Sequence, residues 1–351
     1  MHIFIKNLPK TGRFYKNMLI LLCVTAFASI LSGCKPVLTK PLTVTGYKLN
    51  TYVTISAYTL GSHKTAEVYD ILNEALALCD YYEKLFSRTL PESTLYRINN
   101  QETDVAPAEL ADLIRKGIYY GELSDGAFDI TIGSVSSLWD FTAQTPTVPD
   151  KNDIEQALQF VDYTNIKLTD NSDGTATISM PKGTIIDLGA IAKGYIADKI
   201  KELLIANSID SAVINLGGNI LCVGSKASNQ NFNIAIKNPF SENGTPLVTL
   251  SLNSKSAVSS GTYERFFYVN DTFYHHILDS DTGYPCSNEL TGVTIISELS
   301  VDGDCLSTVC FALGTEKGMK LIETTEGVEA IFLANDGSVQ YSSGFNSYIK
   351  N

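Results

Sequence analysis

The chain has 351 residues and carries 26 Lys and Arg against 38 Asp and Glu, so its formal net charge is −12. This acidic balance disfavours a nucleic acid as the partner, because a polyanion binds basic surfaces, and we interpret it as a contribution to solubility. The seven cysteines are scattered and include no C-x-x-C pair, so neither a disulfide framework nor a zinc or dithiol site is expected.

The first 45 residues have the pattern of an export leader followed by a tether. A basic segment without acidic residues precedes an apolar run over residues 18–30, which is short for a membrane span. Leu31-Ser32-Gly33-Cys34 then has the form of a lipobox, in which Cys34 is acylated. We therefore expect a lipoprotein signal peptide over 1–33, a lipid-anchored tether over 34–45 and one domain over 46–351, at the extracytoplasmic face of the cell membrane. An ordinary signal peptide or signal anchor with an incidental cysteine is the alternative.

The elements of the N-terminal half are predicted from hydrophobic periodicity and turn residues. Helices are predicted over residues 65–86, 107–123 and 152–160. Strands are predicted over residues 47–58, 166–169 and 175–179, the last two joined by a turn at Asn171-Ser172-Asp173-Gly174.

The most informative segment follows a predicted strand over residues 184–186. Asp187 stands where that strand ends, Gly189 allows close approach of another group, and a helix with one apolar face begins after them. The free N–H groups of the first helical turn attract anions, so the segment is a candidate seat for a phosphate-bearing ligand. The alternative is that Asp and Gly only shape the turn.

The C-terminal half mixes hairpins with helices. Strands are predicted over residues 212–215, 233–236, 248–252, 257–259, 293–296 and 330–333, and helices over 302–313 and 316–324. Hairpin turns are predicted at Asn270-Asp271 and at Asn335-Asp336-Gly337. Because strands and helices do not alternate regularly, we expect an α+β fold with antiparallel or mixed sheets and flanking helices. No G-x-G-x-x-G motif follows a strand, which disfavours a dinucleotide-binding Rossmann site.

Residues 187–198 (DLGAIAKGYIAD) resemble a signature of the ApbE family, the FAD:protein FMN transferases. Six further stretches resemble motifs of the same family, in the same order: residues 86–99 (FSRTLPESTLYRIN), 126–133 (GAFDITIG), 215–219 (NLGGN), 257–265 (AVSSGTYER), 276–285 (HILDSDTGYP) and 304–308 (DCLST). The resemblance extends over residues 45–345 and implies a single catalytic unit of that family's fold.

The resemblance also implies a reaction and its residues. Members bind FAD and Mg²⁺, transfer the FMN half of FAD to a Thr or Ser hydroxyl of a target protein, and release AMP. The positions that contact FAD in the family correspond here to Leu49, Thr89, Ala127, Phe128, Asp129, Asp187, Lys193 and Leu278. The metal positions correspond to Asp304, Thr308 and the backbone carbonyl of Ala190. Asp304 and Thr308 are one helical turn apart and offer the oxygen ligands that Mg²⁺ prefers; on residues alone, Asp304 could equally be a helix cap.

A base is needed for the attacking hydroxyl. His276 occupies the family motif and is the first candidate, with Asp279 the second; a structural histidine is the alternative interpretation. His275 should face the other side of the strand and matter less. With an unperturbed imidazole, the rate should rise through a pH of about 6.5.

Two other functions are compatible with these residues. An FAD pyrophosphatase would use water in place of the protein hydroxyl, and a non-catalytic FAD-binding lipoprotein would need neither metal nor base. For a transferase outside the cytoplasmic membrane, we expect the target to be an exported or membrane-bound electron-transfer protein.

Overall fold

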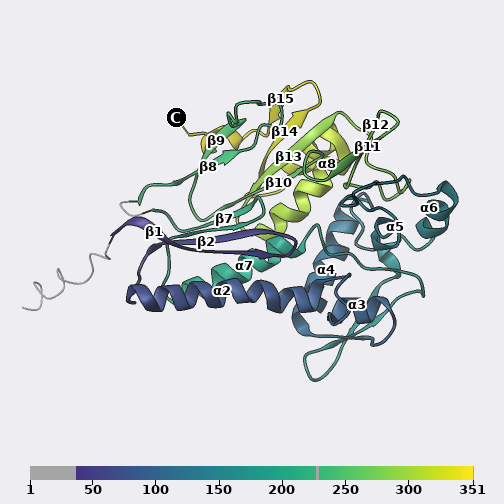
Figure 1. The fold of residues 1–351 in the computed structure, drawn as a ribbon, viewed down its shortest axis with the longest axis horizontal. Helices are drawn as coiled ribbons and strands as arrows, with labels where there is room; N and C mark the ends of the chain where they lie inside the picture. The colour runs from purple at the N-terminus through teal and green to yellow at the C-terminus, as the bar shows by residue number, and fades with distance from the viewer. Residues whose placement is uncertain (1–36, 227–228, 351) are drawn as a thin grey trace, which may run out of the picture.

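An eight-stranded sheet forms the centre of the molecule (Figure 1). The computed structural model describes residues 37–226 and 229–350, so the expected signal peptide and Cys34 lie outside the described residues. In sheet order the strands are β1 (Val37–Lys48), β2 (Thr51–Thr59), β6 (Ala212–Leu216), β7 (Asn219–Val223), β10 (Ser256–Gly261), β13 (Leu290–Ser297), β14 (Glu329–Ala334) and β15 (Val339–Tyr341). Every neighbouring pair is antiparallel.

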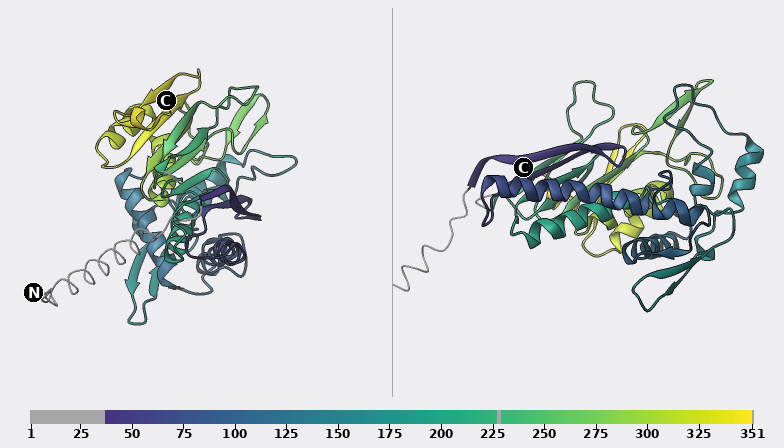
Figure 2. Two further views of the ribbon diagram at one scale, coloured as in Figure 1. Left: turned by 90° about the vertical axis from the view of Figure 1, so that its left-hand side faces the viewer. Right: turned by 60° about the horizontal axis from the view of Figure 1, so that its bottom comes forward.

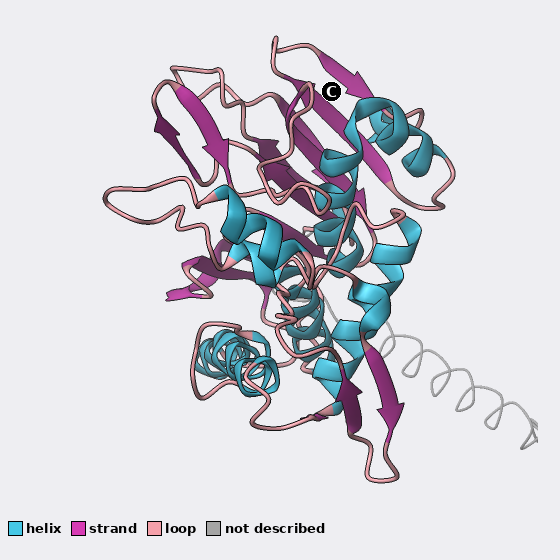
Figure 3. Ribbon diagram, turned by 90° about the vertical axis from the view of Figure 1, so that its right-hand side faces the viewer, coloured by secondary structure: helices cyan, strands magenta, loops and turns pink. Residues whose placement is uncertain are grey.

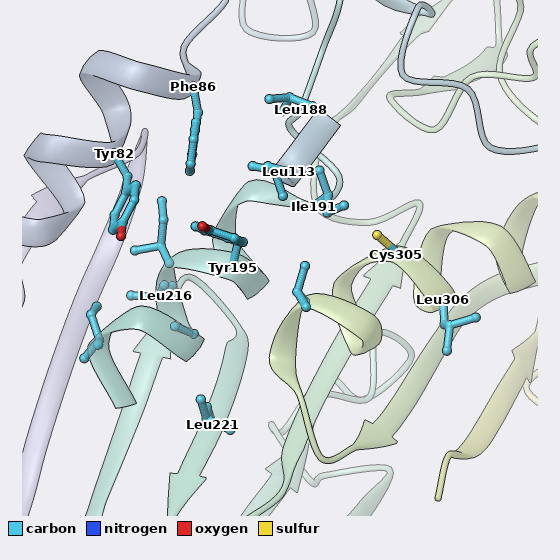
Figure 4. Packing of buried hydrophobic residues seen from close by; sticks show 14 of the residues in the cluster. Tyr82, Phe86, Leu113, Leu188, Ile191, Tyr195, Leu216, Leu221, Cys305 and Leu306 are labelled. Carbon is cyan, nitrogen blue, oxygen red and sulfur yellow. The ribbon is translucent and has the colours of Figure 1, made fainter. Parts of the chain in front are cut away.

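Three helices cover one face of this sheet: α2 (Thr65–Phe86), α7 (Ala192–Ala206) and α8 (Ser300–Glu323). Their buried side chains join those of β2, β6 and β13 in the main hydrophobic core. In Figure 4, Tyr82 and Phe86 of α2 point toward Tyr195 of α7, and their ring centroids lie 5.7 and 5.5 Å from the Tyr195 ring. This packing anchors α7, the helix that follows the Asp187 segment.

The second face of the sheet is covered by a hairpin of β8 (Phe232–Ile236) and β9 (Val248–Leu252). Alternate residues of β13 and β14 face opposite ways: Ile295 belongs to the main core, whereas Ile296 and Ile331 pack with Phe232 under the hairpin. Because both faces are covered here, all eight residues of β13 are buried.

The remaining elements lie beside the helical layer (Figures 2 and 3). The helices among them are α3 (Thr94–Asn99), α4 (Ala108–Leu123), α5 (Gly133–Ser136) and α6 (Lys151–Leu158), with a 3-10 turn at Tyr163–Asn165. A second 3-10 turn, Phe345–Tyr348, packs with the β8–β9 hairpin instead. A small sheet contains β3 (Val105–Ala106), β5 (Ala176–Ser179) and β4 (Lys167–Asp170), and a separate hairpin contains β11 (Phe266–Val269) and β12 (Thr272–His275). Trp139 anchors a third apolar cluster between α5, α6 and this hairpin.

The expected fold class is confirmed, as is the helix over residues 65–86. The two helices expected on either side of residue 314 are present within α8, which is broken at Gly314, whose φ of 76° and ψ of 176° are not helical. Within the described residues, no helix combines the length and apolar character needed to span a membrane.

Two of the predicted strands were wrong. Residues 47–58 form two strands, because Leu49 and Asn50 have φ of 54° and 56° and make the turn between β1 and β2. Residues 37–45, part of the expected tether, lie in β1, where Leu42 and Val44 pack against the main core. Residues 184–186 form no strand; a single parallel bridge joins Ile185 to Ile132, and the segment is apolar because it is buried.

Candidate active site

Asp304 lies at the contact between α7 and α8. Its side chain is buried, and its Oδ2 accepts a hydrogen bond of 2.8 Å from the backbone N–H of Gly194 in the first turn of α7. The Nζ of Lys193 is 3.7 Å from Oδ1. Burial raises the pKa of Asp304, while the Lys193 charge and the Gly194 N–H oppose that rise. Asp304 therefore caps the neighbouring helix α7 rather than its own helix α8, and its Oδ1 faces the Lys193 ammonium.

Thr308 lies one turn further along α8 and is half-buried. Its Oγ1 is 3.2 Å from the hydroxyl of Ser260 on β10, which is itself 2.7 Å from the hydroxyl of Ser307. Sequence reasoning did not single out Ser260, although it lies in the motif over residues 257–265. Ala190 is half-buried in the turn that leads into α7, so the three expected metal positions come from the segments that meet at this helix contact.

Asn219 approaches the same carboxylate from the sheet. Its Oδ1 accepts a hydrogen bond of 2.6 Å from Ser300 at the start of α8. Its buried Nδ2 is near enough to lower the pKa of Asp304, yet forms no hydrogen bond of normal geometry among the described residues. Gly217 and Gly218, with φ of 65° and 97°, make the tight β6–β7 turn that places Asn219 there. Asn219 Nδ2 is therefore a donor on the Asp304 side of the site.

Asp187 is the centre of a second polar group. Its Oδ2 accepts hydrogen bonds from Arg88 Nε at 2.7 Å and from the Ser136 hydroxyl at 3.1 Å, and its Oδ1 accepts one from the Gly189 N–H at 2.9 Å. Lys193 joins this group to the first, because its Nζ donates to the carbonyl of Gly189 at 3.3 Å. Arg88 was not predicted: it is 99 residues from Asp187 and carries no local signal of the contact.

His276 follows the last residue of β12. Its Nδ1 is 3.2 Å from the carbonyl oxygen of Arg265. A carbonyl only accepts hydrogen bonds, so Nδ1 carries the proton and Nε2 keeps its lone pair. Burial lowers the pKa of His276 to about 4, and the positive charges of Arg265 and Lys193 add to this effect. The residue is therefore a neutral base near the Lys193 ammonium.

His275 has a different environment. Its Nε2 lies 3.1 Å from the carbonyl oxygen of Cys286, and its Nδ1 accepts the N–H of Ile277 at 3.3 Å. Both ring nitrogens are thus engaged by backbone groups, and the side chain is buried. The expectation that the two histidines face different surroundings holds, and only His276 has an imidazole nitrogen left to accept a proton.

Asp129 and Asp279 shape loops through their carboxylates. Asp129 is buried and accepts hydrogen bonds from the N–H and hydroxyl of Thr131 and from the N–H of Tyr163. Asp279 Oδ1 accepts the N–H groups of Asp281 and Thr282 at 3.0 and 2.8 Å, which forms the turn after His276. These bonds assign Oδ1 of Asp279 to the turn, and its expected role as the second candidate base stays a prediction.

The other expected FAD positions are spread over two apolar clusters, a turn and two loops. Phe128 is buried in the main core, and Leu278 packs with the Trp139 cluster. Leu49 lies in the β1–β2 turn and Thr89 is exposed in the loop after α2, while Ala127 is half-buried. Hydrogen bonds and a close ion pair thus link Asp187, Lys193 and Asp304 through Gly189, while Thr308 lies one turn beyond Asp304 and Ala190 follows Gly189.

The donor set fits a cation that shares its coordination with a phosphate ligand. Within residues 37–226 and 229–350, no three His, Cys, Asp or Glu side chains are grouped to hold a metal. A single carboxylate with a hydroxyl suits Mg²⁺, which keeps only one or two protein carboxylates and binds substrate phosphates as well. Asp304, Thr308 and the Ala190 segment supply such oxygens, and Lys193 adds a positive charge.

Comparisons with known proteins find similarity along most of the chain. The ApbE family model matches residues 49–332. An FAD:protein FMN transferase of Treponema pallidum is 35% identical over 293 residues, which cover 80% of this chain and 81% of that protein. A protein of the same name from Klebsiella pneumoniae is 35% identical over 302 residues, covering 84% and 93%.

Solved structures show the same fold. The crystal structure of the ApbE protein of Thermotoga maritima superposes with a TM-score of 0.79 at 28% identity, covering 89% of this chain and 100% of that one. The apo form of the flavinyl transferase ApbE of Pseudomonas stutzeri gives a TM-score of 0.75 at 26% identity, covering 88% and 96%.

Proposed function

The chain belongs to the ApbE family, and on that premise we propose that it is an FAD:protein FMN transferase that uses Mg²⁺ and a Thr or Ser acceptor. The observation that carries the proposal is the meeting of Asp304, Lys193 and Gly194 at the α7–α8 contact. One oxygen of Asp304 is held by a backbone N–H, so the carboxylate has a set orientation. Its other oxygen, Oδ1, lies 3.7 Å from the Lys193 ammonium, and we assign the cation to this side of the carboxylate.

A bound Mg²⁺ neutralises charge on the FAD diphosphate and fixes its position. The residues for it are Asp304, Thr308 and the carbonyl of Ala190. The Lys193 ammonium, 3.7 Å from Asp304 Oδ1, supplies further positive charge beside the same phosphates. Its hydrogen bond to the Gly189 carbonyl keeps the side chain directed along the turn that precedes α7.

The transfer exchanges one phosphorus–oxygen bond for another. The acceptor hydroxyl oxygen bonds to the phosphorus of the FMN half, the diphosphate bond on the AMP side breaks, and AMP leaves with the bridging oxygen. The hydroxyl proton passes to Nε2 of His276, which is the unprotonated nitrogen because Nδ1 donates to Arg265. Arg265 therefore fixes the tautomer of the base through its backbone.

We place the enzyme at the extracytoplasmic face of the cell membrane, anchored through Cys34. The basic segment, apolar run and lipobox of residues 6–34 support this location. A target in the same compartment must be exported or membrane-bound, and we propose an electron-transfer protein as its class.

Product analysis tests the reaction. The protein is incubated with FAD, Mg²⁺ and a fraction of exported proteins, and AMP, free FMN and protein-bound FMN are each measured. We expect AMP and protein-bound FMN in equal amounts. Release of AMP with an equal amount of free FMN would show a pyrophosphatase, and FAD binding without AMP release would show a carrier.

A further inference from the structure

Asp198 caps the N-terminus of α8 from the neighbouring helix α7. Its Oδ1 accepts the N–H of Ser300 and its Oδ2 accepts the N–H of Val301, both at 2.9 Å. These are the first two residues of α8, whose N–H groups have no partner within the helix. Leu299, at the N-cap position, provides no side-chain cap. Asp198 therefore supplies the cap that α8 lacks.

A reciprocal cap runs from α8 to the N-terminus of α7. Asp304 of α8 accepts the N–H of Gly194 near the N-terminus of α7, where Ile191 also provides no side-chain cap. Each helix thus contributes one aspartate to the first turn of the other. We call the pair Asp198 and Asp304, with their backbone partners, the aspartate clamp.

The clamp needs close contact between the two backbones. A Cβ at Gly194 would lie 2.4 Å from the carbonyl oxygen of Ser300 and 2.6 Å from the Cα of Val301. Asp198 is one turn after Gly194, and Asp304 is one turn after Ser300 and Val301. Both carboxylates are buried, at 8% and 5% exposure, so their bonds are shielded from water.

Asp198 does not belong to the reaction centre itself. Its charge interactions are with Lys201 and Asp302, whereas Lys193 and Asn219 act on Asp304. An effect of Asp198 on the cation site therefore passes through Ser300 and Val301, at the start of the helix that carries both Asp304 and Thr308.

We propose that Asp198 is a positioning residue for the cation site: by capping α8 it holds Asp304 and Thr308 at their places beside the start of α7. This role rests on the proposed function, because it concerns the Mg²⁺ of that reaction. A cap that only stabilised the fold would change the unfolding midpoint and leave Mg²⁺ affinity unchanged.

The test compares Asp198→Ala and Asp198→Asn with a matched cap on the same helix. Glu289 accepts the N–H of Thr315 at 2.8 Å, beyond the break at Gly314, so Glu289→Ala removes a carboxylate cap far from Asp304. For each full-length variant, FAD binding is measured in EDTA by flavin fluorescence. Mg²⁺ is then titrated calorimetrically into the FAD complex, and exchange of the Gly194 amide hydrogen is followed without ligand.

We expect Asp198→Ala to weaken Mg²⁺ binding by about 10- to 100-fold, the range found for residues that orient metal ligands. FAD binding in EDTA should change by less than about threefold, and the Gly194 amide should exchange faster. Asp198→Asn keeps one acceptor oxygen and should recover part of the Mg²⁺ affinity, while Glu289→Ala should change neither Mg²⁺ binding nor Gly194 exchange.

Three outcomes would overturn the proposal. Unchanged Mg²⁺ affinity in both Asp198 variants, whether or not Gly194 exchange rises, would make Asp198 a stability cap only. An equal loss in Glu289→Ala would show a general effect of weakening α8. If the wild-type FAD complex binds no Mg²⁺, both the cation site and the positioning role of Asp198 are excluded. If it binds Mg²⁺ but transfers no FMN, only the proposed reaction is contradicted. If Asp198→Ala does not fold, the Mg²⁺ affinities of Asp198→Asn and Glu289→Ala are compared instead, and a loss in Asp198→Asn alone supports the proposal.

Discussion

The imidazole of His276 should stay neutral across the physiological pH range. Burial, with the charges of Arg265 and Lys193, lowers its pKa to about 4. At pH 5.5 a group with that pKa is about 3% protonated, whereas an unperturbed imidazole with a pKa of about 6.5 is about 90% protonated. The sequence alone predicted a rate that rises near pH 6.5, and the structure replaces that expectation: no such rise should originate from this residue.

The titration of His276 can be observed directly by NMR of the histidine ring protons, with the resonance assigned by its loss in His276→Ala. We expect no titration of this resonance between pH 5.5 and 8. Because the unfolded chain binds the proton more tightly, His276 should lower folding stability as the pH falls from about 6.5 toward 4. A resonance that titrates with a midpoint near 6.5 would refute the desolvation argument and restore the original expectation.

Three further predictions concern the clamp, the β6–β7 turn and the membrane anchor. Burial raises the pKa of Asp198 from 3.8 to about 6, so its protonation stabilises the fold at low pH and that stability is lost as the pH rises through 6. The free energy of unfolding of wild type relative to Asp198→Asn should therefore fall by roughly 2–3 kcal/mol between pH 4 and 7 in urea titrations, and a pH-independent difference would contradict the assigned pKa. Gly217→Ala should cost about 1–3 kcal/mol of stability, because the new Cβ would lie 2.1 Å from Thr51 Oγ1. Gly218→Ala, which meets nothing within 4 Å, should cost less, and equal losses in chemical denaturation would argue against the clash. Cys34→Ala should move the protein out of the membrane fraction, and retention there with an unlipidated mature N-terminus would exclude the anchor.

Helices and strands whose apolar residues recur with a clear period could be predicted from the sequence. The helix over residues 65–86 was found with its correct bounds, because Val68, Leu72 and Cys79 recur on one buried face. The hairpin of β1 and β2 was missed, because the alternation of polar and apolar residues continues through the turn. Tyr47 pairs with Tyr52, and both side chains are exposed. A period of two does not reveal where one strand ends and its antiparallel partner begins.

Candidate site residues could be named from motifs, but their contacts could not. Asp304 was expected either as a metal ligand or as a cap of its own helix, and the structure shows that it caps α7, 110 residues away in sequence. The pairing of Arg88 with Asp187 has no signal at either position. Asp279 and Asp129 lie in motifs yet are engaged by their own loops, since a carboxylate two residues before a backbone N–H readily forms such a turn.

The most direct test of the central claim is the Mg²⁺ dependence of FMN transfer by Asp304→Asn. Asn can still accept the Gly194 N–H, so the variant should fold, while the charge that faces the cation is lost. Covalent flavin on exported acceptor proteins is measured by in-gel fluorescence over a range of Mg²⁺ concentrations. We expect transfer to fall by more than about 100-fold at low Mg²⁺ and to recover partly at high Mg²⁺. Transfer at the wild-type rate in low Mg²⁺ would contradict the assignment of Asp304 to the reaction centre.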